Sequence, residues 1–342
     1  MNGSALVYCA GGGIGDSMIA SIVARALHTR FGTVDALTLP GHASALERIP
    51  DFDRVFVDAN EPERDLAQTV CARGYDAAVV TWATARTAKI PRLARIPIRA
   101  GQARRIYSWQ FTHRVPVRSE FGDVTSHWSQ ILLDYARAIG CDTGDPVPAF
   151  RTTPADESEA AAILAELQLD SAPFAILHTT NAIAPKRGIW PVRGWSNLAR
   201  AIAERFNVTV LLSGVPADRP IVERIAEESG ARPIAGKASL GGFAALAKRA
   251  SHFTGITTGS MHVAAAVGCP TVGIFPFQTD TPERWAPLGP RTEIVRASYP
   301  CRKGERKETC PDYACIANLD VPRILAACEA VVGPLTEARS AG

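Results

Sequence analysis

The chain has 342 residues, of which 46% are hydrophobic and 21% are charged, and its formal net charge at pH 7 is +3. This composition excludes a disordered chain, and the length predicts about two domains that can each bury a core. The small charge excludes a dedicated nucleic-acid binder, and the lack of a membrane-spanning apolar run or a signal peptide predicts a soluble, cytoplasmic protein.

The first half of the chain alternates short β-rich apolar runs with helical patterns, which is typical of βαβ units in a parallel sheet. In chain order we predict a strand at 5–10, a helix at 17–30, strands at 34–39 and 54–58, a helix at 62–73, a strand at 75–81 and a helix at 124–139. The segment 141–154 is rich in Gly, Pro, Asp and Thr and shows no periodicity, so we place a domain boundary there.

The second half repeats this alternation. We predict strands at 174–178, 208–213, 251–256, 271–275 and 293–296, and helices at 194–205, 220–229, 240–250, 261–267 and 321–332. The expected organisation is one domain at 1–150, a second at 151–332 and a frayed tail at 333–342. Both domains are expected to be α/β, doubly wound and Rossmann-like, facing each other across a cleft, with ligands bound beyond the carboxyl ends of the strands.

A glycine-rich turn, Gly-Gly-Gly-Ile-Gly-Asp at 11–16, follows the first predicted strand and leads into a helix. The turn lacks the Gly-Lys-Ser/Thr of a P-loop, and the dinucleotide fingerprint fails because Asp16 or Met18 stands where it needs a third small residue. Asp16 is ionised at neutral pH and is therefore a candidate general base. The alternative is a carboxylate that only complements the helix dipole.

The most specific stretch is Thr-Gly-Ile-Thr-Thr-Gly-Ser-Met-His-Val-Ala-Ala-Ala-Val-Gly-Cys-Pro at 254–270. A strand enters a Thr/Gly/Ser loop that opens a helix of small residues, and the unpaired N–H groups of such a helix start suit a diphosphate. An element Asp-Thr-Pro-Glu-Arg-Trp-Ala-Pro-Leu-Gly follows at 280–289.

These two elements resemble the heptosyltransferases of glycosyltransferase family 9, which have the two-domain GT-B fold. The family pattern is approximately Asp-Thr-Gly-x-x-His-x-Ala-Ala-Ala-x-Gly-x-Pro, followed by Thr-Asp-Pro-x-Arg-Trp-x-Pro-x-Gly. Asp16 falls where the family carries its proposed base, and the segment 178–195 resembles the family's donor-phosphate segment. The resemblance covers almost the whole chain.

The resemblance implies that the first domain binds the acceptor, at Gly13 and Gly15 among others, and that the second binds a nucleotide sugar. The implied donor residues are Thr179, Thr180, Lys186, Asp218, Thr257, Thr258, Gly259, Ser260 and His262. Two of these have ordinary alternatives, a surface lysine for Lys186 and a packed helix residue for His262. This chain departs from the family at Thr257, where the family usually has Asp, and at Ser260, where Pro is common. The donor is therefore ADP-heptose, as in most of the family, or another nucleotide sugar.

Nine basic residues lie between positions 86 and 118 with no acidic residue among them, and Tyr107 and Trp109 are interleaved. A solvated face is the ordinary explanation, but arginines also bind phosphate and carboxylate groups through two hydrogen bonds. We predict that Arg104 and Arg105 help hold an anionic acceptor such as a phosphorylated lipopolysaccharide core, at a membrane surface. RNA would use similar residues, but the chain has no RNA-binding motif.

Three cysteines, Cys301, Cys310 and Cys315, cluster in one polar loop, and Cys328 lies on the last predicted helix. Their spacing is not that of a standard zinc site, so reduced thiols are favoured over a metal or disulfide role.

The resulting hypothesis is a glycosyltransferase that works by an inverting single displacement, with no cofactor and no catalytic metal. We expect it in the cytoplasm, with a peripheral contact to the inner face of the cytoplasmic membrane. The alternatives are a nucleotide-sugar epimerase of the same fold, which needs no acceptor site, and a catalytically degenerate sugar-binding or scaffold protein, for which Thr257 is the main support.

Overall fold

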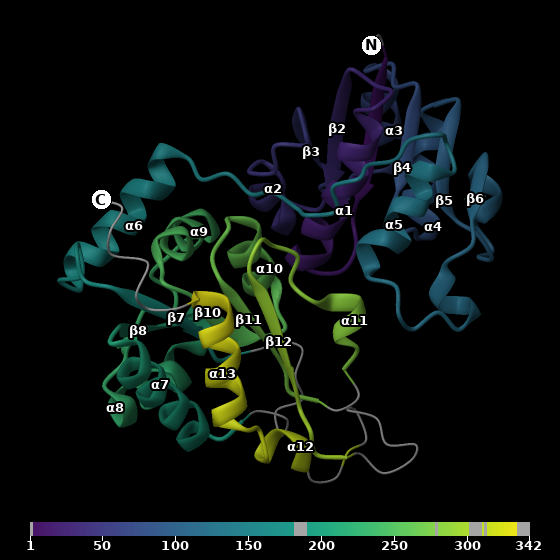
Figure 1. Cartoon of the computed structure of the whole chain (residues 1–342). Helices are drawn as coiled ribbons and strands as arrows, with labels where there is room; N and C mark the ends of the chain where they lie inside the picture. The colour runs from purple at the N-terminus through teal and green to yellow at the C-terminus, as the bar shows by residue number, and fades with distance from the viewer. Residues whose placement is uncertain (1–2, 181–189, 278–279, 301–309, 311–312, 334–342) are drawn as a thin grey trace. The chain divides into compact units, whose positions relative to one another are not determined.

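The computed structural model describes residues 3–180, 190–277, 280–300, 310 and 313–333. The chain divides into two compact units, residues 1–151 (unit 1) and 152–342 (unit 2). Each unit is built on a six-stranded sheet in which the neighbouring strands are parallel, with helices on both faces (Figure 1). The predicted pair of Rossmann-like α/β units is confirmed.

The sheet of unit 1 has the strand order β3-β2-β1-β4-β5-β6. Its strands are β1 (Ser4–Cys9), β2 (Thr33–Thr38), β3 (Arg54–Val57), β4 (Ala77–Val80), β5 (Ile98–Gln102) and β6 (His113–Val115). The central strand β4 is apolar throughout and β1 is buried after Ser4, because helices bury both faces of a parallel sheet.

The helices of unit 1 are α1 (Ile14–Leu27), α2 (Pro40–Leu46), α3 (Glu63–Cys71), α4 (Ala85–Leu93) and α5 (Trp128–Arg137), with 3-10 turns η1 (Ser108–Gln110) and η2 (Arg118–Phe121). Helix α1 packs against α2 and α5, whereas α3 packs against α4. One core cluster joins α3 and α4 to Leu6 and Tyr8 of β1, so these two helices cover the face opposite to α1.

Helix α1 begins three residues before the predicted start at position 17. Gly13 is its N-cap, in an extended conformation, and Asp16 is the third helical residue. The glycine-rich turn therefore contributes its last residues to the helix. Asp16 lies inside the first turn, not ahead of it.

The basic stretch at 86–118 contains three elements that periodicity does not reveal, namely α4, β5 and β6. Pro91 stands inside α4, a position at which proline normally ends a helix, and Arg99 and Gly101 interrupt the apolar pattern of β5. Tertiary packing overrides these local signals because Ile90 and Ala100 are fully buried.

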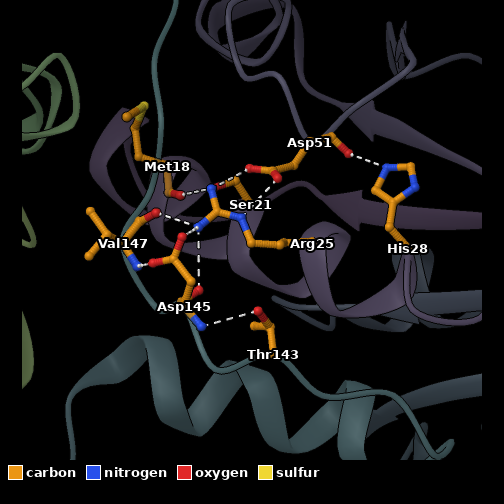
Figure 2. A network of polar contacts seen from close by, with 8 residues as sticks. All are labelled: Met18, Ser21, Arg25, His28, Asp51, Thr143, Asp145 and Val147. Carbon is orange, nitrogen blue, oxygen red and sulfur yellow. Dashed lines mark hydrogen bonds and ion pairs between the residues drawn. The ribbon is translucent and has the colours of Figure 1, made fainter.

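The segment that leaves α5 is held against α1 by Arg25. Its guanidinium pairs with Asp51 at 2.9 Å and with Asp145 at 2.7 Å, and it donates to the Val147 carbonyl at 2.7 Å (Figure 2). His28 lies 3.0 Å from the backbone oxygen of Asp51. This network gives a fixed path to a segment that has no regular secondary structure.

The sheet of unit 2 has the strand order β12-β11-β10-β7-β8-β9. Its strands are β7 (Phe174–His178), β8 (Thr209–Ser213), β9 (Arg232–Pro233), β10 (Phe253–Ile256), β11 (Thr271–Phe275) and β12 (Thr292–Arg296). Its helices are α6 (Pro154–Glu166), α7 (Val192–Phe206), α8 (Arg219–Ser229), α9 (Leu240–Arg249), α10 (Gly259–Ala266), α11 (Pro282–Trp285), α12 (Ala314–Ala317) and α13 (Val321–Val332), with the 3-10 turn η3 (Pro216–Asp218).

One core cluster of unit 2 packs α7, α8 and α13 against the sheet around Trp195, Leu212 and Ile324. Helix α9 packs against α6 and against α10, and α10 also contacts β10 and β11. Among the described residues, no helix is long and apolar enough to cross a membrane.

Candidate active site

Three neighbouring strands of unit 2 bring the predicted donor residues to one edge of the sheet. Gly255 of β10 pairs with His178 of β7, which in turn pairs with Ser213 of β8. Because these strands are parallel, the residues that follow them leave the sheet at the same carboxyl edge. This edge carries Thr179 and Thr180, the segment 257–260, and Asp218.

The loops after β7 and β8 are joined by a hydroxyl and a carboxylate. Thr180 Oγ1 donates to Asp218 Oδ2 at 2.7 Å, and the same oxygen accepts from the Val215 backbone N–H at 2.8 Å. Thr179, which is 1% exposed, has a buried Oγ1 without a hydrogen-bond partner among the described residues. A buried hydroxyl left unpaired lowers stability, so Thr179 is a candidate for pairing with a ligand.

The loop after β10 enters α10 with Thr258 as the N-cap residue, although its side chain makes no capping bond. Thr258 Oγ1 is also buried without a hydrogen-bond partner among the described residues. Gly259 and Ser260 open the helix, and the backbone N–H groups of a first helical turn lack intrahelical acceptors. The positive end of the helix dipole and these donors suit a phosphate group.

Two histidines lie beneath this edge. His178 is buried and lies 2.9 Å through Nδ1 from Ser213 Oγ, and burial lowers its pKa to about 4. It is therefore neutral at physiological pH. His262 lies on the first turn of α10 and is 7% exposed. Both roles considered for it from the sequence, ligand contact and packed helix residue, stay predictions.

Lys186, the predicted diphosphate cation, lies outside the described residues. The element at 280–289 forms the short helix α11 at the exit of β11, where Asp280 Oδ2 accepts from the Phe277 backbone N–H at 3.2 Å. The second family-like element thus also follows the carboxyl end of a strand, where ligands bind in such sheets.

In unit 1, Asp16 forms one half of a capping box with the glycine-rich turn, since the N-cap residue Gly13 has no side chain to form the other half. Its Oδ2 accepts from the Gly13 backbone N–H at 2.6 Å. Gly12 has a φ of 70°, and a Cβ atom there would overlap the Asp16 carboxylate. Glycine is therefore required at position 12, whereas a side chain would fit at Gly13. The acceptor-binding role of Gly13 and Gly15 stays a prediction.

Burial raises the pKa of Asp16 above its ordinary value, and the hydrogen bond from Gly13 partly offsets this effect. His42, at the start of α2, also favours the charged carboxylate through its own positive charge. Its Nδ1 lies 3.0 Å from Ser17 Oγ. The sequence reasoning missed His42, although it comes shortly after a predicted strand, and site residues are expected where strands end.

Trp82 is a second residue that the sequence reasoning missed, although it directly follows a predicted strand. Its ring stacks on Trp128 with centroids 5.3 Å apart and planes 7° from parallel. A Cβ atom on Gly11 would collide with the Trp82 side chain. The first glycine of the turn is therefore needed for this close packing.

Arg104 and Arg105 follow β5, two strands away from β1 in the same sheet. Strands are spaced about 4.8 Å apart, so at the level of the sheet the two exits lie about 10 Å apart. Arg104 lies over the Phe121 ring, 4.8 Å from its centroid, and Arg105 forms an ion pair with Glu120. Both side chains are exposed.

The basic stretch is less strongly charged than its sequence indicates. Acidic residues from other segments pair with several of its cations, including Asp58 with Arg86 at 2.6 Å and Asp134 with Arg118 at 2.5 Å. Glu63 pairs likewise with Lys89. The fold thus brings in carboxylates that are distant in sequence, and these neutralise part of the charge of the stretch.

Of the clustered cysteines, Cys301 lies outside the described residues. Cys315 is buried, Cys310 Sγ accepts from the Tyr313 backbone N–H at 3.3 Å, and neither forms a disulfide with another described residue. Cys328 is buried and lies 3.2 Å through Sγ from Thr254 Oγ1, so it packs in the core of unit 2.

The comparisons with known proteins agree with this architecture. A model of glycosyltransferase family 9 (heptosyltransferase) matches residues 63–314. The structure is similar to ADP-heptose lipopolysaccharide heptosyltransferase II of E. coli, with a TM-score of 0.77 at 19% identity over 97% of this chain and 98% of that one. It is also similar to a family 9 glycosyltransferase from Veillonella parvula, with a TM-score of 0.82 at 16% identity over 97% and 98%.

A third similar structure is E. coli heptosyltransferase WaaC with ADP, with a TM-score of 0.67 at 19% identity over 86% of this chain and 93% of that one. At these identities the similarity shows a shared fold. No curated relative matches the chain.

Proposed function

The chain belongs to glycosyltransferase family 9, the heptosyltransferases, and from this premise we propose that it transfers a heptose from ADP-heptose to a glycolipid acceptor of the lipopolysaccharide-core type. The chain is a glycosyltransferase; the donor sugar, the acceptor and the chemistry of the step are the proposed part. The proposed reaction inverts the anomeric centre and uses no metal or cofactor.

The observation that carries the donor half is a pair of buried hydroxyls, Thr179 Oγ1 and Thr258 Oγ1, which lie on loops from neighbouring strands and have no hydrogen-bond partner in the part of the chain that the structure describes. Together with the start of α10 they provide donors that a diphosphate would accept from. An ADP group is favoured because WaaC, which shares the fold, was solved with ADP. By resemblance, Lys186 would add a cation to this set.

The acceptor half rests on the glycine-rich turn of unit 1. Asp16 would accept the proton of the acceptor hydroxyl while that oxygen forms a bond to the anomeric carbon of the donor. The bond from the anomeric carbon to the diphosphate oxygen breaks in the same step, and ADP leaves. The growing negative charge would be stabilised by the Thr179, Thr180 and Thr258–Ser260 donors.

The reaction is tested by incubating the protein with ADP-heptose in the presence and absence of a lipopolysaccharide-core acceptor. We expect release of ADP only when the acceptor is added, together with an acceptor product of higher mass. Conversion of the donor without acceptor would favour the epimerase alternative. Donor binding with no reaction under either condition would favour a degenerate sugar-binding protein.

The donor site is tested by Thr258→Val, which replaces the unpaired hydroxyl by a methyl group. Without ligand we expect the stability to stay or to rise by about 1 kcal/mol, since no hydrogen bond is lost, while the stabilisation by ADP falls. Both are read from melting temperatures measured with and without ADP.

Thr271→Val is the matched control, because its buried hydroxyl donates to the Cys269 carbonyl at 2.8 Å. This control should lose about 1 kcal/mol of stability and keep the ADP response. An unchanged ADP response in Thr258→Val would remove Thr258 from the site.

A further inference from the structure

Unit 1 exposes four large apolar side chains close together in sequence at one edge of its sheet. Ile106 is 94% exposed, Trp109 57%, Phe121 60% and Val124 58%. We call these four residues the edge patch. They lie around η1 and η2, beside the edge strand β6.

The backbone of the edge patch is held in place, so the exposure is built into the fold. Ser108 Oγ donates to the Gln102 carbonyl at 2.7 Å, and the Tyr107 hydroxyl donates to the Ala83 carbonyl at 2.5 Å. These contacts turn Tyr107 and Ser108 toward the protein. Ile106 lies two residues before η1 and Trp109 lies within it, and both side chains are left exposed.

The η2 side of the edge patch is joined to the η1 side by charged groups. Arg105 pairs with Glu120, and Gln102 Nε2 donates to the same carboxylate at 3.0 Å. Arg104 lies over the Phe121 ring. These contacts place Ile106 and Phe121 on the same rim of unit 1.

Arginines border the apolar side chains. The Arg92 guanidinium lies 4.9 Å from the Trp109 ring centroid, and Arg104 lies in the same way over the Phe121 ring. Residues 92–124 contain seven arginines and two carboxylates, so an excess of positive charge remains after Glu120 pairs with Arg105 and Asp134 pairs with Arg118. Exposed apolar and aromatic side chains flanked by arginines match the interface of an anionic bilayer, where apolar groups enter the acyl boundary and guanidinium groups remain at the phosphates.

We propose that the edge patch docks unit 1 onto an anionic phospholipid membrane, with Ile106, Trp109 and Phe121 inserted and Arg92 and Arg104 at the headgroups. The new element is the surface itself, because the sequence led us to expect a membrane contact without locating it, and the proposal does not depend on the transfer reaction. A protein partner would also bury such side chains, but the excess of positive charge around them favours a uniformly anionic surface. The docking places the exit of β5, with its predicted acceptor arginines, at the membrane.

The test is flotation of the full chain with vesicles of phosphatidylglycerol and phosphatidylethanolamine, compared with vesicles of phosphatidylcholine. We expect binding to the anionic vesicles only, weakened by added salt. The triple variant Ile106→Ala, Trp109→Ala, Phe121→Ala should bind about tenfold or more weakly, because interfacial binding scales with the apolar area buried. Arg104→Gln should lower binding at low salt more than the control Arg64→Gln, since Arg64 is an exposed arginine on α3.

Val57→Ala is the apolar control, because Val57 is 40% exposed on β3, at the opposite edge of the same sheet. It should float like the original protein. The stabilisation by ADP, measured on the triple variant, should be unchanged, which separates a lost docking surface from a lost fold or donor site.

Three results would overturn the proposal. One is a protein that stays unbound to the anionic vesicles, and another is a triple variant that floats as well as the original. The third is a protein that ignores vesicles but forms a concentration-dependent dimer that the triple variant abolishes, which would assign the edge patch to a second copy of the chain. A missing ADP response in the original protein would instead count against the proposed donor and leave the docking result standing.

Discussion

Asp16 illustrates how one side chain can serve both structure and chemistry. Its Oδ2 caps the first turn of α1 through the Gly13 N–H, which supports the structural explanation considered for it from the sequence. A carboxylate has a second oxygen that can accept a proton, so the cap leaves room for a base. Burial raises the pKa of Asp16 and the neighbouring His42 lowers it, so a role as the base can be tested through the pH dependence of the reaction.

Asp16→Asn separates the two roles. The amide oxygen of Asn can still accept from Gly13, so we expect little change in melting temperature, but the proton acceptor is removed. The transfer rate should fall by about 10²–10⁴-fold while donor binding is retained. Initial rates, melting temperature and the ADP response are measured on the same preparation.

The matched control for Asp16→Asn is Asp156→Asn. Asp156 occupies the same third position in α6 and accepts from the capping Thr153 N–H at 2.9 Å. This variant should have the original transfer rate. A near-original rate in Asp16→Asn would leave the proposed mechanism without its base.

The pH dependence of kcat/KM provides a second test at this scale. Burial raises the pKa of Asp16, so the acid limb of the profile should have its midpoint above the ordinary Asp value of about 4. His42→Gln removes a positive charge that, when His42 is protonated at acidic pH, favours the ionised carboxylate. The midpoint should therefore move to higher pH in this variant.

His113→Gln is the control for His42→Gln, because His113 pairs through Nδ1 with the Thr112 hydroxyl at 2.9 Å as His42 pairs with Ser17. It should leave the profile in place. An acid limb that is the same in His42→Gln and the original protein would show that His42 has no effect on the base.

At the scale of secondary-structure elements, strand exits decide where functional residues gather. The loops after β7, β8 and β10 lie together because these strands are neighbours in the sheet. In the chain they are far apart, since His178 of β7 and Thr254 of β10 are separated by 76 positions. Elsewhere a single side chain organises a segment that has no regular structure. Arg25 does so for the chain that leaves α5.

Arg25→Ala should destabilise unit 1 by about 3 kcal/mol, because Asp51 would be left with its partner removed at a site where its side chain is 13% exposed. The free energy of unfolding is measured by denaturant titration. Lys89→Ala removes one member of a more exposed ion pair, with Glu63, and should cost less than about 1 kcal/mol. Equal losses in the two variants would show that the Arg25 network is no more than a surface contact.

At the scale of the whole molecule, all the predicted donor residues belong to unit 2 and the proposed base belongs to unit 1. Chains with two compact units commonly unfold in more than one transition. A ligand stabilises the unit that binds it, by about 2.7 kcal/mol when present at a hundred times its dissociation constant.

We therefore expect calorimetry of the full chain to show two transitions, of which ADP raises only one. The transition of unit 2 is identified by Thr271→Val and that of unit 1 by Arg25→Ala, since each should lower the melting temperature of its own unit. A rise in the Arg25-sensitive transition alone would place the ADP site in unit 1 and reverse the assignment of the domains.

The α/β class and most of the strand and helix order were predictable from the sequence, because alternating apolar runs and glycine-rich strand exits are local patterns. The family resemblance also depended on local motifs, at 254–270 and 280–289. Asp16 was proposed as a base from its place after the first predicted strand, whereas Thr179 and Thr258 were named as donor residues through the family resemblance, and all three roles stay predictions.

Only the tertiary structure showed which distant residues meet. Burial of Ile90 and Ala100 made α4 and β5 out of a stretch whose arginines and proline conceal any periodicity. Strand order brought Asp58 to Arg86 and set His42 near Asp16. The physical reason is that sequence periodicity reports which face of an element is buried, whereas charge pairing and pKa depend on neighbours that other elements supply.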